Sequence, residues 1–249
     1  MEGTGTAMSF EVQSNIQRLR KFLVTSFNIV FLGGAGVSTE SGIPDFRGEN
    51  GLNKAGLTIP AEIMLSHDYF LAHPDEFYNY FRKTLVLPNV QPNAAHLKLA
   101  ELEERGNLKA VITQNIDGLH QKAGSRNVFE LHGNASKFYC TECGRIYDLD
   151  ILDDSLGAPL CRCGGLVRPD VVLYGEGLDQ GVVSKAVAHI RRADMLIVGG
   201  TSLSVYPAAG LINYYSGDKL VIINQMPTGY DNKADLLIAD KIGEVFSGL

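Results

Sequence analysis

The cysteines have the clearest chemical spacing in this chain. All 4 lie between positions 140 and 163, as a C-x-x-C pair and a C-x-C pair, and glycines follow both pairs. Four thiolates presented by two tight turns can surround one Zn²⁺ tetrahedrally, which leaves no coordination position for water. The alternative, four ordinary buried thiols, does not account for the pairing. The spacing therefore predicts one structural, non-catalytic zinc ion bound by Cys140, Cys143, Cys161 and Cys163.

A second stretch that could bind a ligand begins with the apolar run at 29–32, which has the length and composition of a buried parallel strand. The run ends in a glycine-rich turn at 33–36, whose backbone amides could approach a phosphate group. Thr39 stands where a dinucleotide fingerprint has its third glycine, so the spacing alone is weak evidence for a nucleotide. Polar residues crowd the next positions and favour the wall of a ligand site: Ser38, Thr39, Glu40, Ser41, Asp45 and Arg47.

Alternating strands and helices must position these residues. We expect strands at 29–32, 108–113, 171–174, 195–198, 220–223 and 236–239. We expect helices at 12–27, 60–65, 75–86, 93–104, 182–192 and 208–215. This alternation predicts an α/β fold, a Rossmann-like doubly wound parallel sheet with right-handed connections, interrupted by a smaller inserted zinc-binding domain.

The order of these elements predicts where the domains begin and end. The large domain would comprise residues 9–55, 88–133 and 169–249. A helical insert at 56–87 and a zinc module at 134–168 would form the small domain, and residues 1–8 would be a disordered tail or a cloning remnant. Ligands of doubly wound sheets bind at the carboxyl ends of the strands. Polar side chains gather at these ends, notably at 114–117, 175–176, 199–202 and 224–225.

Composition excludes some classes of protein. The chain has 249 residues, of which 45% are hydrophobic and 20% charged, and a net charge of −6. This is a globular profile, and the acidic balance argues against direct binding to nucleic acid. No apolar run is long enough to cross a bilayer, and the N-terminus lacks the features of an export signal, so we expect a cytoplasmic protein. The sequence does not indicate an oligomeric state, and a monomer is the default expectation.

Several motifs, taken together, resemble those of a known family. These motifs are GAGVSTESGIPDFR at 34–47, TQNIDGLHQKAG at 113–124, ELHG at 130–133, the paired cysteines, RPDVVLYGE at 168–176, GGTSLSVYPAAG at 199–210 and INQ at 223–225. In this order and combination they resemble the motifs of sirtuins, which are NAD-dependent protein-lysine deacylases. The resemblance spans about residues 10–249 and points to a bacterial-type member. It implies a cleft between the two domains that NAD and an acetyl-lysine enter from opposite sides.

The resemblance also implies roles for single residues. His132 would be the general base on the nicotinamide ribose, although a lone histidine after a short strand is more often structural. Asn115 would be a second catalytic residue that contacts the ribose and orders a water. Asp117 would line the carboxamide pocket, and its alternative role is a helix cap. The implied NAD-binding set is Gly34, Ala35, Gly36, Ser38, Asp45, Phe46, Arg47, Gln114, Asn115, Ile116, Asp117, His132, Gly200, Thr201, Ser202, Asn224, Gln225 and Ile242.

Two further parts of the implied site have alternatives. Arg47 would reach the pyrophosphate and Phe46 would cover the nicotinamide site, while an Asp45–Arg47 ion pair could instead pin the loop. One segment would pair with an extended substrate peptide as an added strand, although a plain buried strand is also possible. The implied substrate-binding residues are Val171, Val172, Leu173, Tyr174, Gly175, Glu176 and Val205.

The implied reaction starts when the acyl oxygen of the modified lysine attacks the anomeric carbon of the nicotinamide ribose. Nicotinamide leaves, His132 deprotonates the ribose diol, and water finally releases lysine and O-acetyl-ADP-ribose. Transfer of ADP-ribose to protein could use the same NAD site. An NAD-dependent dehydrogenase would not explain the DFR stretch or the cysteines, and a non-catalytic NAD or zinc module has no use for a base such as His132.

The acyl group that the site accepts can also be predicted from the resemblance. Sirtuins that prefer succinyl- or malonyl-lysine resemble one another in a Tyr and an Arg shortly after the glycine-rich loop. The corresponding stretch here, residues 51–65, contains neither, and Lys54 is its only cation. A buried carboxylate without a fixed partner is costly. We therefore expect an apolar tunnel that accepts acetyl or a longer neutral group.

Overall fold

The computed structural model describes residues 10–45, 51, 59–87, 89–153 and 157–249. Its larger part is a parallel sheet of 6 strands in the order β3-β2-β1-β7-β8-β9. These strands are β1 (Ile29–Gly33), β2 (Leu108–Thr113), β3 (Val128–Glu130), β7 (Met195–Gly199), β8 (Leu220–Ile223) and β9 (Leu236–Ile238). Every residue of β1 is buried, because β1 lies between two parallel neighbours and under helices on both faces. The predicted α/β fold class is confirmed.

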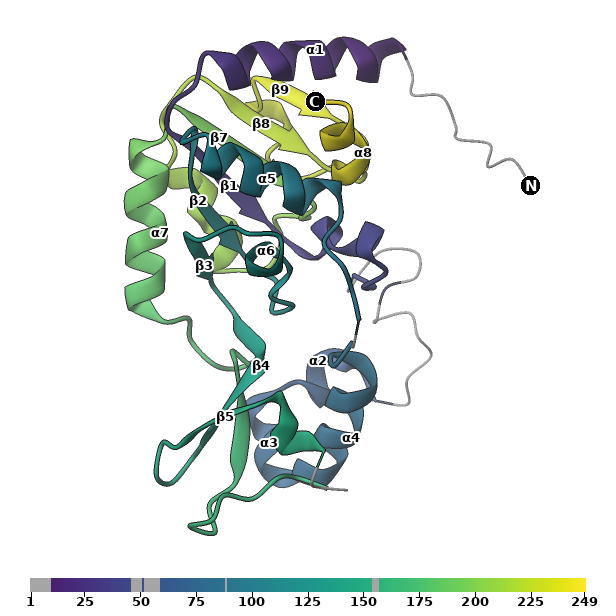
Figure 1. The fold of residues 1–249 in the computed structure, drawn as a ribbon, viewed down its shortest axis with the longest axis vertical. Coiled ribbons are helices and arrows are strands. Elements are labelled where there is room, and N and C mark those ends of the chain that lie inside the picture. Colours follow the sequence, from purple (N-terminus) through teal and green to yellow (C-terminus); the bar gives the residue numbers. More distant parts are fainter. Residues whose placement is uncertain (1–9, 46–50, 52–58, 88, 154–156) are drawn as a thin grey trace, which may run out of the picture.

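Helices cover both faces of this sheet. One core is formed against α1 (Phe10–Val24), α5 (Ala94–Glu104) and α8 (Ile242–Ser247), with Leu19, Leu99 and Val245 fully buried. The opposite core is formed against α7 (Gln180–Arg192) and the 3-10 helix η5 (Ala208–Tyr214). Figure 1 shows α7 at one side of the sheet and α1, α5 and α8 around its upper end. The alternation seen in the sequence thus produces the two apolar layers that a doubly wound sheet needs.

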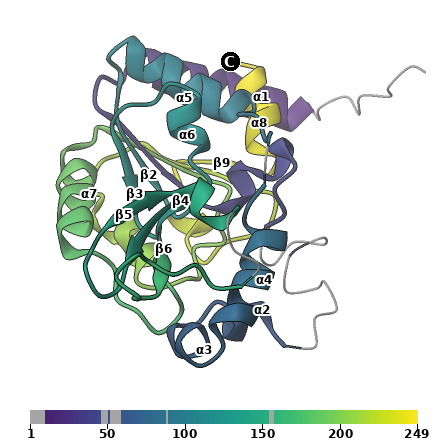
Figure 2. The same cartoon turned by 60° about the horizontal axis from the view of Figure 1, so that its bottom comes forward.

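The smaller part has a core of its own. It combines α2 (Ala61–Met64), α3 (His67–Ala72) and α4 (Pro74–Thr84) with an antiparallel sheet of 3 strands, β5-β4-β6. The strands are β4 (Gly133–Cys140), β5 (Ile146–Asp148) and β6 (Val167–Val171), and 3-10 turn η4 (Leu149–Leu152) follows β5. Figures 1 and 2 show these helices beside the small sheet at one end of the molecule. Buried aromatic side chains join the two layers: Phe70, Phe77, Tyr78, Phe81 and Phe138.

The prediction of a strand at 171–174 in the parallel sheet is wrong. The strand in this region, β6, ends at Val171 and belongs to the small antiparallel sheet, and β3 takes the edge of the large sheet instead. The apolar run misled the prediction because its burial alternates: Val171 and Leu173 enter the small core, whereas Tyr174 is 39% exposed. Such a half-buried pattern is typical of antiparallel pairing.

Most other elements begin and end within a few residues of the predicted ranges. The helix expected at 93–104 is confirmed, and its start has a physical cause in a capping box: Asn93 Oδ1 accepts from the Ala95 amide (2.9 Å) and His96 Nδ1 accepts from the Asn93 amide (3.3 Å). The segment at 208–215 is a 3-10 helix and not an α-helix. The short elements α3, α6 (Leu119–Lys122) and η1 (Ala35–Val37), η2 (Thr39–Ser41) and η6 (Asp231–Lys233) were not predicted.

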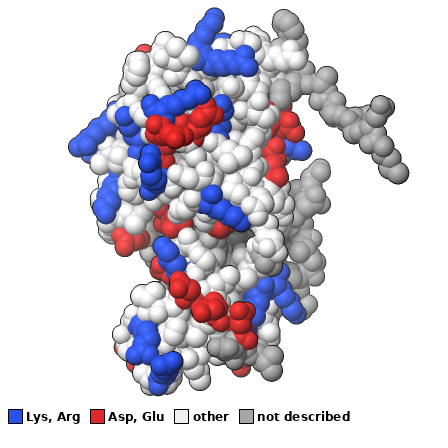
Figure 3. Space-filling model, viewed as in Figure 1, with Lys and Arg blue, Asp and Glu red and all other residues white. Residues whose placement is uncertain are grey.

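The surface is mixed in charge. On the face drawn in Figure 3, acidic and basic side chains of the described residues lie among one another and among neutral ones. No helix in the described ranges is both long enough and apolar enough to span a bilayer.

The aromatic core should dominate the stability of the smaller part. Phe138 is fully buried and packs edge-on against Phe81 at a centroid distance of 6.0 Å. We expect Phe138→Ala to lower the free energy of unfolding by about 3–5 kcal/mol, because it leaves an aromatic-sized cavity. Urea denaturation measures this loss. Ile146→Ala, at a side chain that is 71% exposed, is the matched control. A loss below about 1 kcal/mol for Phe138→Ala would contradict the assignment of this core.

Candidate active site

Parallel pairing brings the polar candidate residues to one edge of the large sheet. Gly33, the last residue of β1, is in register with Thr113 of β2 and with Gly199 of β7, and Gly199 is in register with Ile223 of β8. The loops that follow are joined by backbone bonds, from the Gln114 amide to the Gly33 carbonyl (3.0 Å) and from the Gly200 amide to the Ile223 carbonyl (3.0 Å). The polar residues at the ends of β1, β2, β7 and β8 therefore line a single edge.

The glycines at this edge allow two loops to touch. A Cβ on Gly36 would lie 2.8 Å from Gly200 Cα, and a Cβ on Gly34 would lie 2.8 Å from Thr201 Cβ. The amides of Gly34 and Gly36 donate to the carbonyls of Gly199 (3.3 Å) and Gly200 (2.8 Å). These two amides are thus used in loop packing. The Ala35 amide makes no backbone hydrogen bond within the described ranges. The Thr39 hydroxyl donates to the Gly36 carbonyl (3.0 Å).

A serine connects the first loop to the polar residues after β2. Ser38 Oγ donates to Asp117 Oδ2 (2.6 Å) and accepts from Asn115 Nδ2 (3.0 Å), although Ser38 is almost fully buried. Asp117 Oδ1 accepts from the Leu119 amide (2.9 Å), so this carboxylate also stabilises the start of α6. Both roles considered for Asp117 are therefore compatible. Asn115 is half-buried, and its orientation is fixed by Ser38.

Two buried histidines lie behind this network. His96 Nδ1 accepts from the Asn93 amide, so the proton of a neutral ring is on Nε2, which lies 3.5 Å from Ser38 Oγ. The ring of His120 lies 4.7 Å from that of His96, and neither of its nitrogens has a partner among the described residues. Burial lowers the pKa of His96 to about 4 and that of His120 to about 3. Both rings are thus neutral near pH 7. His96 was not among the predicted site residues, and its signal in the sequence is its place three residues after the helix cap.

His132 lies between β3 and β4 with one nitrogen fixed. Its Nδ1 donates to the Gln114 carbonyl (2.9 Å), and Nε2 has no hydrogen-bond partner among the described residues. Burial lowers the pKa of His132, while the bond to Gln114 opposes this shift. A half-buried neutral imidazole with a free Nε2 can accept a proton from a bound ligand. Gln114 in turn donates from Nε2 to Thr201 Oγ1 (3.1 Å), which connects β2 to β7 at this edge.

The remaining NAD-binding candidates follow β7 and β8. Thr201 is buried, whereas Ser202 is exposed with its Oγ 2.7 Å from Ser204 Oγ. Asn224 Nδ2 donates to the Met226 carbonyl (2.7 Å), and Gln225 is exposed. Ile242 is buried, and a Cβ on Gly199 would lie 2.2 Å from its Cδ1, so Ile242 packs against the end of β7 rather than projecting outward.

Some predicted residues lie elsewhere. Ile116 packs against the small core, and its carbonyl accepts from the Ala135 amide (2.9 Å). Val205 is half-buried before η5, and Asp45 is half-buried and takes part in an interaction. Phe46, Arg47 and Lys54 lie outside the described residues. The predicted substrate-binding segment starts at the end of β6 and meets the site directly, because the Val172 amide donates to the His132 carbonyl (2.9 Å).

The predicted cysteine cluster is confirmed. The four Sγ atoms lie within 4.8 Å of one another, with 3.5 Å between Cys140 and Cys163 and 3.6 Å between Cys143 and Cys161. Tetrahedral thiolates at a Zn–S distance of about 2.3 Å are roughly 3.8 Å apart, so the cluster fits a zinc ion. Tyr147 Oη donates to Cys161 Sγ (3.0 Å) and the Glu142 amide to Cys140 Sγ (3.4 Å). These donors can orient the thiolates, as outer-shell partners of metal ligands do.

The chain is similar to named bacterial proteins over most of its length. A model of the Sir2 family matches residues 34–207. Two proteins named NAD-dependent protein deacetylase, from Clostridium perfringens and Clostridium acetobutylicum, are 55% identical over 238 residues and 54% identical over 234 residues. The first comparison covers 94% of this chain and 98% of the relative, and the second 92% and 96%.

Solved structures give the same result. A Sir2 with a p53 peptide and NAD⁺ is 41% identical, with a TM-score of 0.83 over 93% of this chain and 95% of that chain. A Sir2 bound to a propionylated peptide is 41% identical, with a TM-score of 0.82 over 93% of this chain and 95% of that chain. Likeness of this extent in both sequence and fold leaves one assignment: the chain belongs to the Sir2 family.

Proposed function

We propose that this protein is an NAD-dependent protein-lysine deacetylase, which converts NAD and an acetylated lysine into nicotinamide, O-acetyl-ADP-ribose and free lysine. The observation that carries the proposal is the placement of His132. Its Nδ1 is bonded to the Gln114 carbonyl, its Nε2 has no partner in the described part of the chain, and its own carbonyl holds the segment expected to bind the peptide. A base fixed between a nucleotide edge and a peptide segment suits a reaction that joins the two.

The residues at the sheet edge fit NAD. The Ala35 amide and the side chains of Thr201 and Asn224 can hold its adenosine and phosphate parts, and Asn115 and Asp117 can hold its nicotinamide ribose and carboxamide. Bound NAD supplies the nicotinamide leaving group, so the protein need only orient and stabilise. Ser38 orients both Asn115 and Asp117. Roles for Phe46 and Arg47 rest on the motif alone.

His132 acts as the general base in this proposal. With its Nδ1–H fixed on Gln114, the ring presents Nε2 as a proton acceptor toward a ribose hydroxyl. A pKa below the usual 6.5 keeps the ring unprotonated at neutral pH, so the base is ready before the substrate arrives. Asn115 supplies an amide that can position a hydroxyl or a water.

The four thiols are proposed as a structural zinc site. All four ligand positions are filled by Cys140, Cys143, Cys161 and Cys163, so the metal would stabilise the fold and leave the chemistry to the sheet edge. Thiols arranged for a metal suit a reducing compartment, which supports a cytoplasmic location.

Transfer of ADP-ribose to protein would use the same NAD site. Deacetylation is favoured because the relatives with about half of their residues identical to this chain are named deacetylases. Mass spectrometry of an acetylated peptide incubated with protein and NAD separates the two, since one reaction removes an acetyl group and the other adds ADP-ribose. Mass gain without loss of acetyl would refute the proposal.

Replacing His132 tests the base directly. We expect His132→Ala to lower kcat/KM for an acetylated peptide by about 10²–10⁴-fold, because a positioned general base contributes this much. His73→Ala removes an exposed imidazole of the helical insert and is the matched control. Because the pKa of His132 is lowered and the neutral ring is the active form, the acid limb of wild-type kcat/KM should lie below pH 6.5. A limb above pH 6.5, or near-normal turnover of His132→Ala, would refute the assignment.

Loss of zinc should act through folding. We expect elemental analysis to find one zinc per chain, and Cys140→Ser to release it and lower the melting temperature, because structural zinc contributes folding free energy. Tyr147→Phe removes a donor to Cys161 but none of the four thiols and should retain the metal. Metal-free protein with an unchanged melting temperature and unchanged turnover would contradict the structural role.

Acyl selectivity follows from the stretch at 51–65. We propose a tunnel for neutral acyl groups, since no Arg or Tyr in this stretch can bind a second carboxylate. Peptides that differ only in acetyl-, butyryl- or succinyl-lysine should show succinyl turnover at least about tenfold below acetyl, because an unpaired buried carboxylate costs more than 1.4 kcal/mol. Succinyl turnover equal to acetyl turnover would refute this, and Lys54→Ala would then show whether Lys54 is the missing cation.

A further inference from the structure

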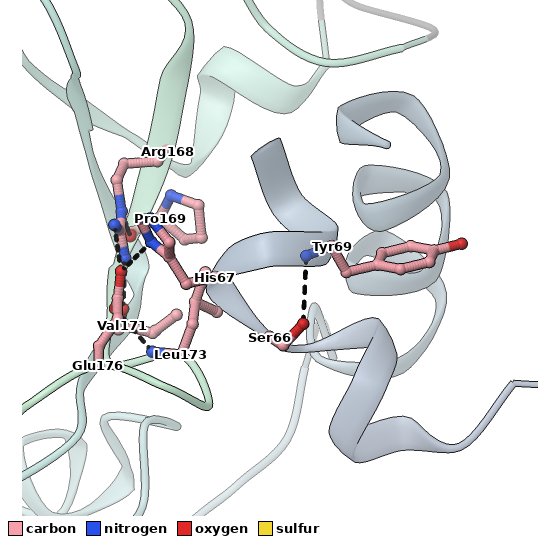
Figure 4. Close-up of polar contacts among 8 residues, drawn as sticks. All are labelled: Ser66, His67, Tyr69, Arg168, Pro169, Val171, Leu173 and Glu176. Atoms are coloured by element: carbon pink, nitrogen blue, oxygen red, sulfur yellow. Dashed lines mark hydrogen bonds and ion pairs between the residues drawn. The ribbon is translucent and has the colours of Figure 1, made fainter. Parts of the chain in front are cut away.

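A carboxylate with four donors lies next to the proposed peptide-binding segment. Arg168 and Glu176 form a fork, with Nη1 to Oε1 at 2.7 Å and Nη2 to Oε2 at 2.9 Å. His67 Nδ1 donates to Oε1 (2.8 Å) and the Leu173 amide to Oε2 (2.9 Å). Figure 4 shows Glu176 between Arg168 and His67, with Leu173 at its other oxygen. Burial opposes ionisation of Glu176, but bonds from Arg168, Leu173 and His67 lower its pKa to about 2, so it is charged at neutral pH.

The donors come from different parts of the chain. His67 is the first residue of α3, Arg168 lies on β6, and Leu173 belongs to the segment itself. Arg168 is 8% exposed, its guanidinium lies over the rings of Phe70 (5.7 Å) and Tyr139 (5.5 Å), and its Nη2 also donates to the Val171 carbonyl (3.0 Å). The carboxylate is therefore held by groups that are themselves fixed in the small core.

These bonds fix the backbone of the segment at 172–176. The Glu176 amide donates to the Leu173 carbonyl (3.0 Å), which closes a turn through Gly175 at φ +92. On one side the Tyr174 amide donates to the Leu65 carbonyl (3.0 Å), and the His67 amide donates to the Tyr174 carbonyl (3.0 Å).

Part of the segment is exposed and has unpaired backbone groups. Tyr174 and Gly175 are exposed, and a Cβ at Gly175 would meet nothing within 4 Å. Among the described residues, the Val172 carbonyl and the Gly175 amide have no hydrogen-bond partner. Backbone groups that are held in place and left unpaired in this way are groups to which a peptide backbone can add.

We propose that Arg168, Glu176 and His67 form a clamp that holds the open edge of residues 172–175 in place for the backbone of the substrate peptide. They are positioning residues for peptide binding and do not touch the reacting atoms. The inference rests on the proposed deacetylase function. It adds which residues determine the affinity for the peptide residues on either side of the acetyl-lysine. An edge that is already fixed loses little conformational entropy when the peptide binds. For a single residue that need not be ordered on binding, the gain in affinity is about tenfold.

Glu176→Gln tests the clamp, because an amide keeps the shape but accepts fewer hydrogen bonds and carries no charge. We expect KM for a peptide with a central acetyl-lysine to rise about tenfold, with kcat within about twofold, since the Val172–His132 bond lies at the other end of the segment. KM for NAD should not change. KM for a single acetyl-lysine blocked at both ends, which has no flanking residues, should change less than twofold. His67→Ala should raise KM for the peptide less, because it removes one donor of four.

Asp170→Asn is the matched control, since it removes one exposed carboxylate from the same strand, and it should behave as wild type. Melting temperatures and fluorescence anisotropy of the labelled acetyl-lysine peptide are measured on the same variants. Equal KM values for wild type and Glu176→Gln would overturn the clamp while leaving the deacetylase function intact. A parallel rise in KM for the peptide and for the single acetyl-lysine, with a fall in melting temperature, would also overturn it and indicate a structural ion pair. Wild type that neither binds nor converts the peptide would refute the proposed function and the clamp with it.

Discussion

The close approach of two loops at the carboxyl edge of the large sheet is the constraint on which the site depends. The loops after β1 and β7 touch at Gly36 and Gly200, where backbone atoms occupy the space of a side chain. This contact requires the parallel register of β1 with β7, which places Gly33 beside Gly199. Because the loops lie this close, Ser38 reaches the residues after β2 and Gln114 reaches Thr201. The glycines that look like a phosphate cradle in the sequence are thus required first for packing, and the polar network follows from it.

Burial gives this edge a uniform electrostatic property: its histidines are neutral. Desolvation lowers the pKa of His96, His120 and His132, and the hydrogen bonds of His96 and His132 leave each with a defined tautomer. A protonated imidazole behind Ser38 would compete for the negative charge of Asp117, so neutrality of His96 leaves this carboxylate to Ser38 and Leu119. His120 and His132 both have ring nitrogens without a partner among the described residues, but those of His120 are enclosed in the core, whereas His132 is half-buried. The same physical effect therefore produces two structural rings and one candidate base.

The sequence permits prediction of those features that depend on local periodicity and on spacing. Strands β1, β2, β7, β8 and β9 of the large sheet, the capped helix at Asn93 and the four-cysteine cluster all follow from patterns within short windows. The edge strand β3 was missed because its 3 residues end in a glutamate and form no apolar run, whereas the equally short β9 is apolar throughout. The stretch after Arg168 was assigned to the wrong sheet because Val171 and its neighbours form an apolar run whose partner strand cannot be read from its composition. Single roles within the site depend on the family resemblance, and contacts between distant segments, such as His67 with Glu176, have no signal in one sequence.

The small antiparallel sheet explains how a zinc ion can matter for chemistry in which it takes no part. β4 runs from Gly133, next to His132, to the zinc ligand Cys140, a span of at most roughly 23 Å for its 8 residues. β6 returns from Val167, which pairs with Cys140, to Val171, which pairs with Gly133. Close backbone contact fixes the site end of this pair, since a Cβ on Gly133 would lie 2.0 Å from the Asp170 carbonyl oxygen. The thiols lie at the other end of the same two strands, so a bound metal would act on His132 and on the proposed peptide segment by fixing the register of the pair.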